Sequence, residues 1–93
     1  AKEKAKGADL LRSVAQTGFA PAQRSLSQHL YTGRSFSRDL IQSYKWIFLA
    51  VRSWPETGRT ELVQELLGIE RSLTPEQLAT AKAEVREWKP SPL

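Results

Sequence analysis

The chain has 93 residues, of which 40% are apolar and 26% are charged, values ordinary for one soluble globular domain. It contains no cysteine, which excludes disulfides, thiolate metal sites and cysteine nucleophiles, and no apolar run approaches the roughly 18 residues that span a bilayer. The net charge of +4 is uneven: residues 1–53 carry nine Lys or Arg against three Asp or Glu, a balance of +6, and residues 54–93 carry five against seven, a balance of −2.

Two helices are expected in the first third of the chain, where apolar residues recur with helical spacing. The first covers residues 3–16 and stops at Gly18, because glycine readily adopts the left-handed conformation that ends helices. Its apolar face consists of Leu10, Leu11 and Val14. The second opens at Pro21, whose fixed φ suits a first helical turn, and ends at Gly33. Its apolar stripe consists of Ala22, Leu26 and Leu30.

The third expected helix has the widest apolar face. Ser37 is expected to cap it, Asp39 suits the positive end of its dipole, and Pro55 prevents its continuation. The apolar face consists of Leu40, Ile41, Tyr44, Ile47, Phe48 and Val51. Trp46 and Ala50 lie off this face, which predicts that the helix is packed on more than one side.

Two more helices are expected after Pro55. One covers residues 59–71, although Gly68 within it costs about 1 kcal/mol relative to alanine. The last begins at Thr74, with a proline in the first turn and Gln77 placed to complete a capping box. The apolar residues of the two helices are Leu62, Leu66, Ile69 and Leu73, then Leu78, Ala81, Val85 and Trp88.

The sequence also contains an internal repeat of pattern. A shift of 36 residues superimposes the first helix on the third, and the shift becomes 40 after an insertion at residues 54–57. The matched pairs include Leu10 with Trp46, Val14 with Ala50, Gly18 with Gly58, Ala22 with Leu62, and Leu26 with Leu66.

One stretch resembles the Sel1-like repeat family in the spacing of every motif position. It reads Ala22-x3-Leu26-Ser27-x2-Leu30-x2-Gly33-x-Ser35-Phe36-x2-Asp39-x2-Gln42-Ser43-x2-Trp46-x3-Ala50. The residue type of the family is kept at Ala22, Leu26, Gly33, Asp39, Trp46 and Ala50. Ser27, Ser35 and Ser43 replace small Gly or Ala residues, and Leu30 takes a Tyr position. A tetratricopeptide array is the nearest rival, disfavoured by the long connection between Gly33 and Asp39.

The resemblance implies an all-α fold, a Sel1-like/TPR-like α-α superhelix (solenoid fragment) of about five helices, similar to the C-terminal portion of a bacterial member. It implies one domain over residues 1–88, divided into a half repeat at 4–17, a full repeat at 21–53, and a terminal repeat half with its capping helix at 58–88. Residues 89–93 are expected to form an exposed tail, since their two prolines exclude a helix.

Proteins of this family act as non-catalytic adaptors or regulators, so the resemblance implies another protein as partner. The binding surface is expected on the concave side, which the first helix of each pair forms. The expected contact residues are Arg24, Gln28 and Tyr31, opposite the apolar stripe of the second helix, and Trp54, in the insertion. No cofactor, membrane span or specific nucleic acid is expected, and a monomer is favoured. Residue 1 is not a Met and is not expected to be a native start, and a periplasmic or cytoplasmic location stays open.

Two other classes of function stay open. Weak binding of nucleic acid or of an acidic partner would use the basic half of the chain, with Arg12, Arg24, Arg34, Arg38, Lys45 and Arg52. A hydrolytic enzyme is least favoured, because His29 is the only histidine and has no carboxylate at helical spacing. The serines around it lie outside any nucleophile motif, and the glutamates lie on expected solvated helix faces. No catalytic residue and no metal ligand is therefore assigned.

Overall fold

The computed structural model describes residues 2–34 and 36–92 of the chain, with side-chain surroundings from residue 7 onward. These residues form five helices and no strand: α1 (Lys2–Gln16), α2 (Ala20–Thr32), α3 (Leu40–Ser53), α4 (Arg59–Glu70) and α5 (Pro75–Glu87). The all-α class and the five expected helices are therefore confirmed. Ser35 of the repeat motif and Leu93 of the tail lie outside the described residues.

The helix ends follow local signals in the sequence. Gly33 has a left-handed backbone with φ 75° and ends α2 by donating its N–H to the His29 carbonyl. Thr74 and Gln77 form both hydrogen bonds of the predicted capping box at the start of α5. The expected cap of α3 was wrong. Asp39 takes this role in place of Ser37, because its carboxylate accepts the Gln42 N–H at 3.0 Å from the residue directly before the helix.

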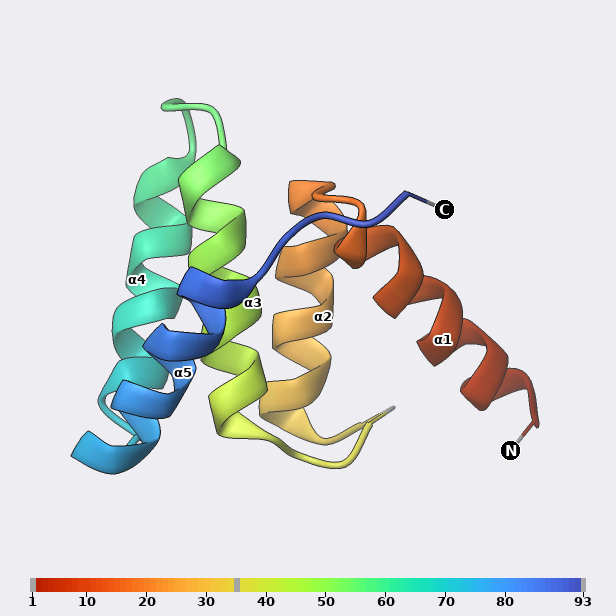
Figure 1. Ribbon diagram of the computed structural model, residues 1–93, viewed down its shortest axis with the longest axis horizontal. Coiled ribbons are helices and arrows are strands. Elements are labelled where there is room, and N and C mark those ends of the chain that lie inside the picture. Colours follow the sequence, from red (N-terminus) through yellow and green to blue (C-terminus); the bar gives the residue numbers. More distant parts are fainter. Residues whose placement is uncertain (1, 35, 93) are drawn as a thin grey trace.

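The helices form a stack in which α3 lies at the centre (Figure 1). It packs against α2 on one side, α4 on the other, and α5, which crosses the stack. By contrast, α1 lies at the edge and packs against α2. Because α3 has neighbours on several sides, even the residues off its main apolar face are buried: Trp46 is 6% exposed and Ala50 is 0% exposed. This confirms the prediction of packing on more than one side.

The buried apolar residues gather in two clusters that share α3. The first lies toward α1 and α2 and includes Ala15, Ala22, Leu26, Leu30, Phe36, Trp46, Leu49 and Val85. The second lies toward α4 and α5 and includes Ala20, Tyr44, Ile47, Ala50, Leu62, Ile69 and Ala81. Each cluster contains residues from several helices, so neither cluster is formed by a single pair of neighbouring helices.

Helices α2 and α3 cross closely at two buried serines. The Ser27 hydroxyl donates to the Ser43 carbonyl at 2.7 Å, and the Ser43 hydroxyl donates to the Ser27 carbonyl at 2.9 Å. Both residues are almost fully buried, so these hydrogen bonds satisfy polar groups that would otherwise be costly to desolvate. Small side chains at this position allow the two backbones to approach.

The C-terminal segment runs back from α5 across the stack to α1 (Figure 1). The Trp88 indole N–H donates to the Gln16 side-chain oxygen at 2.7 Å, and the Ser91 backbone N–H donates to the Gln16 carbonyl at 2.8 Å. Residues 89–92 are exposed and non-helical, as expected. This segment therefore contacts the C-terminal end of α1, an attachment that helical periodicity does not predict.

Candidate functional site

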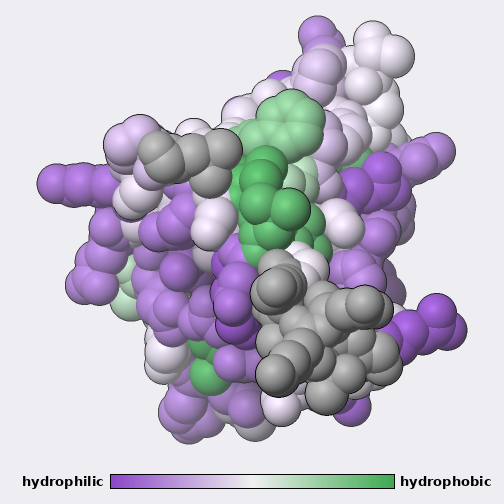
Figure 2. Space-filling view, turned by 90° about the vertical axis from the view of Figure 1, so that its right-hand side faces the viewer, coloured by the Kyte–Doolittle hydropathy of each residue, from purple (hydrophilic) through white to green (hydrophobic). Residues whose placement is uncertain are grey.

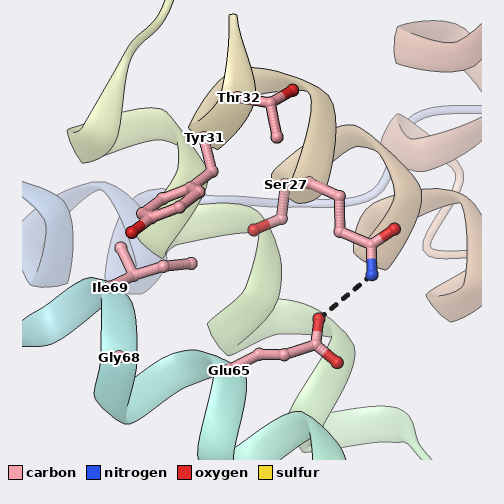
Figure 3. Close-up of a pocket in the computed structure, with 7 residues that line it drawn as sticks. Ser27, Tyr31, Thr32, Glu65, Gly68 and Ile69 are labelled. Atoms are coloured by element: carbon pink, nitrogen blue, oxygen red, sulfur yellow. Dashed lines mark hydrogen bonds between the residues drawn. The ribbon is translucent and has the colours of Figure 1, made fainter.

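A groove lies between α2 and α4 on the surface of the stack (Figure 3). Helical geometry explains its composition, since residues three, four and seven apart share one side of a helix. The side of α2 that faces the groove lies opposite the stripe of Ala22, Leu26 and Leu30. The side of α4 that faces the groove begins near Glu61. The cavity holds about 320 Å³ and is lined by Ser27, Gln28, Tyr31, Thr32, Glu65, Gly68 and Ile69.

One end of the groove is bridged by a carboxylate. Glu65 of α4 accepts hydrogen bonds from Arg24 of α2, at 3.0 Å from Nε and 2.5 Å from Nη2, and from the Gln28 side-chain amide at 3.3 Å. The hydrogen bonds that the Arg24 guanidinium donates to Glu65 raise its pKa, and this effect exceeds the lowering caused by burial. Both side chains keep more than a quarter of their surface exposed, so the pair adds about 1 kcal/mol at most to stability. Its main effect is to fix the orientation of both groups.

The rest of the groove is apolar. Ile69 is 6% exposed and lies in its floor, next to Gly68, which carries no side chain. Tyr31 is 39% exposed, and its ring stands beside Ile69 with the hydroxyl turned outward from α2 (Figure 3). The Arg38 guanidinium lies 5.5 Å from the Tyr31 ring centroid, where it can interact with the face of the ring.

The structure brings three of the four sequence-predicted contact residues together. Gln28 and Tyr31 line the α2 side of the groove, and Arg24 lies just beyond its polar end, where it shares Glu65 with Gln28. Trp54 lies elsewhere, in the turn before α4, where it lines a second cavity with Phe19 and Pro21. It is half-buried against the core, and its ring contacts the Arg24 guanidinium at 5.6 Å.

The α4 side of the groove was not identified from the sequence. Glu65, Gly68 and Ile69 become site residues only because α4 lies beside α2, which is a tertiary relation. The repeat contains a signal that could have found them: the shift of 40 residues places Gln28 on Gly68.

The basic residues of the first half do not form one free surface. Arg24 is held by Glu65, and Lys45 lies 3.8 Å from Glu84 with only 16% of its side chain exposed. The Arg12 guanidinium lies over the Phe36 ring at 4.7 Å. Arg38 likewise lies over the Tyr31 ring, so four of the six basic residues contact other side chains of the fold. Two of them, Arg24 and Lys45, are paired with carboxylates, which weakens the electrostatic case for nucleic acid.

Groups that would suit catalysis are scattered. Within residues 2–34 and 36–92, no three His, Cys, Asp or Glu side chains are grouped so that they could hold a metal ion. His29 is half-buried, with its ring 5.8 Å from that of Phe36. Across the same part of the chain, no helix has the length and apolar character required to cross a membrane.

Comparisons of the chain with family models, with curated proteins and with solved structures give no match. Inference about function therefore starts from the geometry of the α2/α4 groove and the chemistry of its residues.

Proposed function

We propose that this chain is a non-catalytic protein–protein interaction module, a solenoid fragment of the Sel1-like repeat class, which binds a partner protein along the α2/α4 groove. The observation that carries the proposal is that Gln28 and Tyr31 line the α2 side of a groove, whose α4 side includes Glu65, the carboxylate that accepts hydrogen bonds from Arg24. In repeat proteins, equivalent elements line a shared surface that is commonly used for binding.

The repeat itself is supported by equivalent turns. Gly18 precedes α2 with φ 100°, and Gly58 precedes α4 with φ 89°, so both helix pairs turn through a left-handed glycine. One pair of counterparts in the two following helices is also buried in both, since Ala22 is 6% exposed and Leu62 is 1% exposed.

The outer side of α1 also supports a repeat array. Figure 2 shows an apolar strip on the side of the molecule where α1 lies. The large exposed apolar residues of α1 and of the turn that follows it are Leu10, 63% exposed, and Phe19, 56% exposed. Units of a solenoid bury such faces only against a neighbouring unit, so an uncovered strip is expected where a stack is open.

The chemistry of the groove suits a protein partner. Tyrosine combines a large apolar ring with a polar tip and is enriched at protein interfaces. Here it stands half-exposed over an apolar floor, while Arg24 and Gln28 hold Glu65 in one orientation. A rigid polar end next to an apolar hollow provides both orientation and buried area for a bound segment.

The proposal is tested by replacing Arg24, Gln28 and Tyr31 with alanine in one variant. We expect loss of the protein captured from the native cell, with a melting curve close to that of the parent because all three side chains are partly exposed. The matched control replaces three exposed α5 residues, Thr80, Arg86 and Glu87, and should keep capture.

The same variants separate protein binding from nucleic-acid binding. Oligonucleotides should bind the parent only at about 10⁻⁴–10⁻⁶ M at physiological salt, as for sequence-independent contacts. Nanomolar oligonucleotide binding, together with protein capture that survives the triple replacement, would overturn the proposal.

A further inference from the structure

Gly68 leaves the floor of the α2/α4 groove bare, and nothing in the fold requires glycine there. Its backbone is not left-handed, unlike that of Gly18, Gly33 and Gly58. A Cβ atom built on Gly68 would meet no heavy atom within 4 Å in the part of the chain that the structure describes. Glycine inside a helix is destabilising relative to alanine. A close approach of another molecule to the helix backbone would explain its presence.

The dimensions of the hollow limit what enters it. A volume of about 320 Å³ accommodates one or two large side chains but not a whole helix, which is about 10–12 Å across. The surfaces that such a side chain would meet are the Tyr31 ring, the Ile69 side chain and the α4 backbone at Gly68. These surfaces favour an aliphatic or aromatic group.

At the Glu65 end of the hollow two carboxylates, Glu61 and Glu65, face one guanidinium, Arg24, so the local charge is negative. Arg38 lies against the Tyr31 ring at the other end. Both oxygens of Glu65 already accept hydrogen bonds from α2. Glu61, one turn earlier on α4, is 80% exposed, and its carboxylate lies 4.0 Å from the Arg24 guanidinium. A cationic group of a partner can therefore approach Glu61 from solvent.

We propose that the groove binds an extended segment of a partner protein, and that this segment combines a bulky apolar residue with a Lys or Arg. This inference rests on the proposed function. The apolar side chain, from Leu, Phe or Trp, lies over Gly68, and the cation pairs with Glu61. Seven residues of helix separate Gly68 from Glu61, about 10 Å along α4. An extended chain covers this distance in about three residues, which sets the spacing of the motif.

The test is selection from a displayed library of random 12-residue peptides, followed by fluorescence anisotropy with the most enriched peptide. Enriched peptides should carry Leu, Phe or Trp about three residues from Lys or Arg. Gly68→Ala should weaken binding by about tenfold, because the added methyl group occupies the floor, and Glu61→Gln should weaken it by about threefold.

Gly7→Ala is the matched control. Gly7 is also a helical glycine with no heavy atom within 4 Å of a built Cβ among the described residues, but it lies on α1, outside the groove. Both glycine replacements should raise the melting temperature, and only Gly68→Ala should weaken the peptide.

Acidic enriched peptides, failure of any peptide to be enriched, or equal affinity of the Gly68→Ala and Gly7→Ala variants would overturn the inference. The triple replacement of Arg24, Gln28 and Tyr31 then locates the failure. If it still abolishes capture of the native partner, the proposed function stands and only the basic-apolar motif is wrong. If it leaves capture intact, the groove itself is not the binding surface.

Discussion

Helices α1 and α3 occupy the same position in the sequence repeat but have different surroundings. Shifted by 36 residues, Leu10 of α1 corresponds to Trp46 of α3, yet Leu10 is 63% exposed and Trp46 is 6% exposed. The difference arises because α3 packs against α2, α4 and α5, whereas α1 packs against α2 and is contacted by the C-terminal segment. Repeat position therefore predicts a helix and its apolar stripe, while neighbouring helices determine how deeply the stripe is buried.

The helix crossing shows the same contrast. Ser43 of α3 is 0% exposed and exchanges hydrogen bonds with Ser27 of α2. Its counterpart on α1 is Gly7, which is exposed. Both helices have a small residue at this position, but only Ser43 lies where another helix crosses closely: a Cβ built on Gly7 meets no heavy atom within 4 Å among the described residues.

The largest expected difference follows from removing the matched large side chains. Trp46→Ala should lower the free energy of unfolding by about 3–5 kcal/mol, because it deletes a buried aromatic. Leu10→Ala should change it by no more than about 0.5 kcal/mol, as for exposed sites. Urea denaturation followed by circular dichroism measures both. Equal losses for the two variants would show that α1 is as deeply packed as α3.

A second test enlarges the small residue at the crossing. Ser43→Leu should destabilise by about 1–3 kcal/mol or more, since the added volume pushes α2 away and breaks the hydrogen bonds with Ser27. Gly7→Leu should be neutral or stabilising, because a Cβ atom there meets no heavy atom within 4 Å among the described residues and leucine is the better helix former. Thermal melts of the two variants provide the comparison, and a Gly7→Leu variant as unstable as Ser43→Leu would contradict it.

A third test uses pH, because α3 carries a buried phenol, Tyr44, where α1 has Ala8. Burial, with a smaller contribution from the Glu70 charge, raises the pKa of Tyr44 above its ordinary value of 10.0. The folded state therefore keeps its proton at a pH where the unfolded chain has lost it. Measured against the fully ionised state, the protonated Tyr44 makes its full contribution to the free energy of unfolding below pH 10. This contribution is lost as pH rises toward the folded pKa, by about 1.4 kcal/mol per pH unit.

Tyr44→Phe removes this ionisation and is the control for it. Denaturation series at increasing alkaline pH should show a steeper loss of stability for the parent than for Tyr44→Phe. Parallel curves for the two proteins would mean that Tyr44 ionises equally well in the folded and unfolded states.

Local signals made the helices predictable, whereas contacts between distant segments were not. The capping box at Thr74 and the left-handed Gly33 depend on a few adjacent residues, and both were identified from the sequence. Ser37 and Asp39 are both good caps, and only the path of the chain into α3 distinguishes them. The hydrogen bond between Ser91 and Gln16 of α1 joins positions 75 residues apart in the sequence, and helical periodicity cannot predict such a contact.

The candidate site was half predictable for the same reason. Arg24, Gln28 and Tyr31 are predictable from the sequence because they lie opposite a buried stripe, a relation within one helix. Their pairing with Glu65 depends on α4 lying beside α2, a relation across 41 residues for Arg24. Trp54 is expected to contact a partner, but its half-buried side chain packs against the core. Its position before a proline does not indicate this packing.

The most direct test of the central claim is a chemical-shift map of the ¹⁵N-labelled chain titrated with the partner protein recovered by capture. If the α2/α4 groove is the binding surface, the largest perturbations should fall on the exposed side of α2 around Gln28 and Tyr31, and on α4 around Glu65 and Gly68. Perturbations concentrated instead on α1 and around Arg38, with α4 unaffected, would contradict the account and place the interaction on the basic half of the chain.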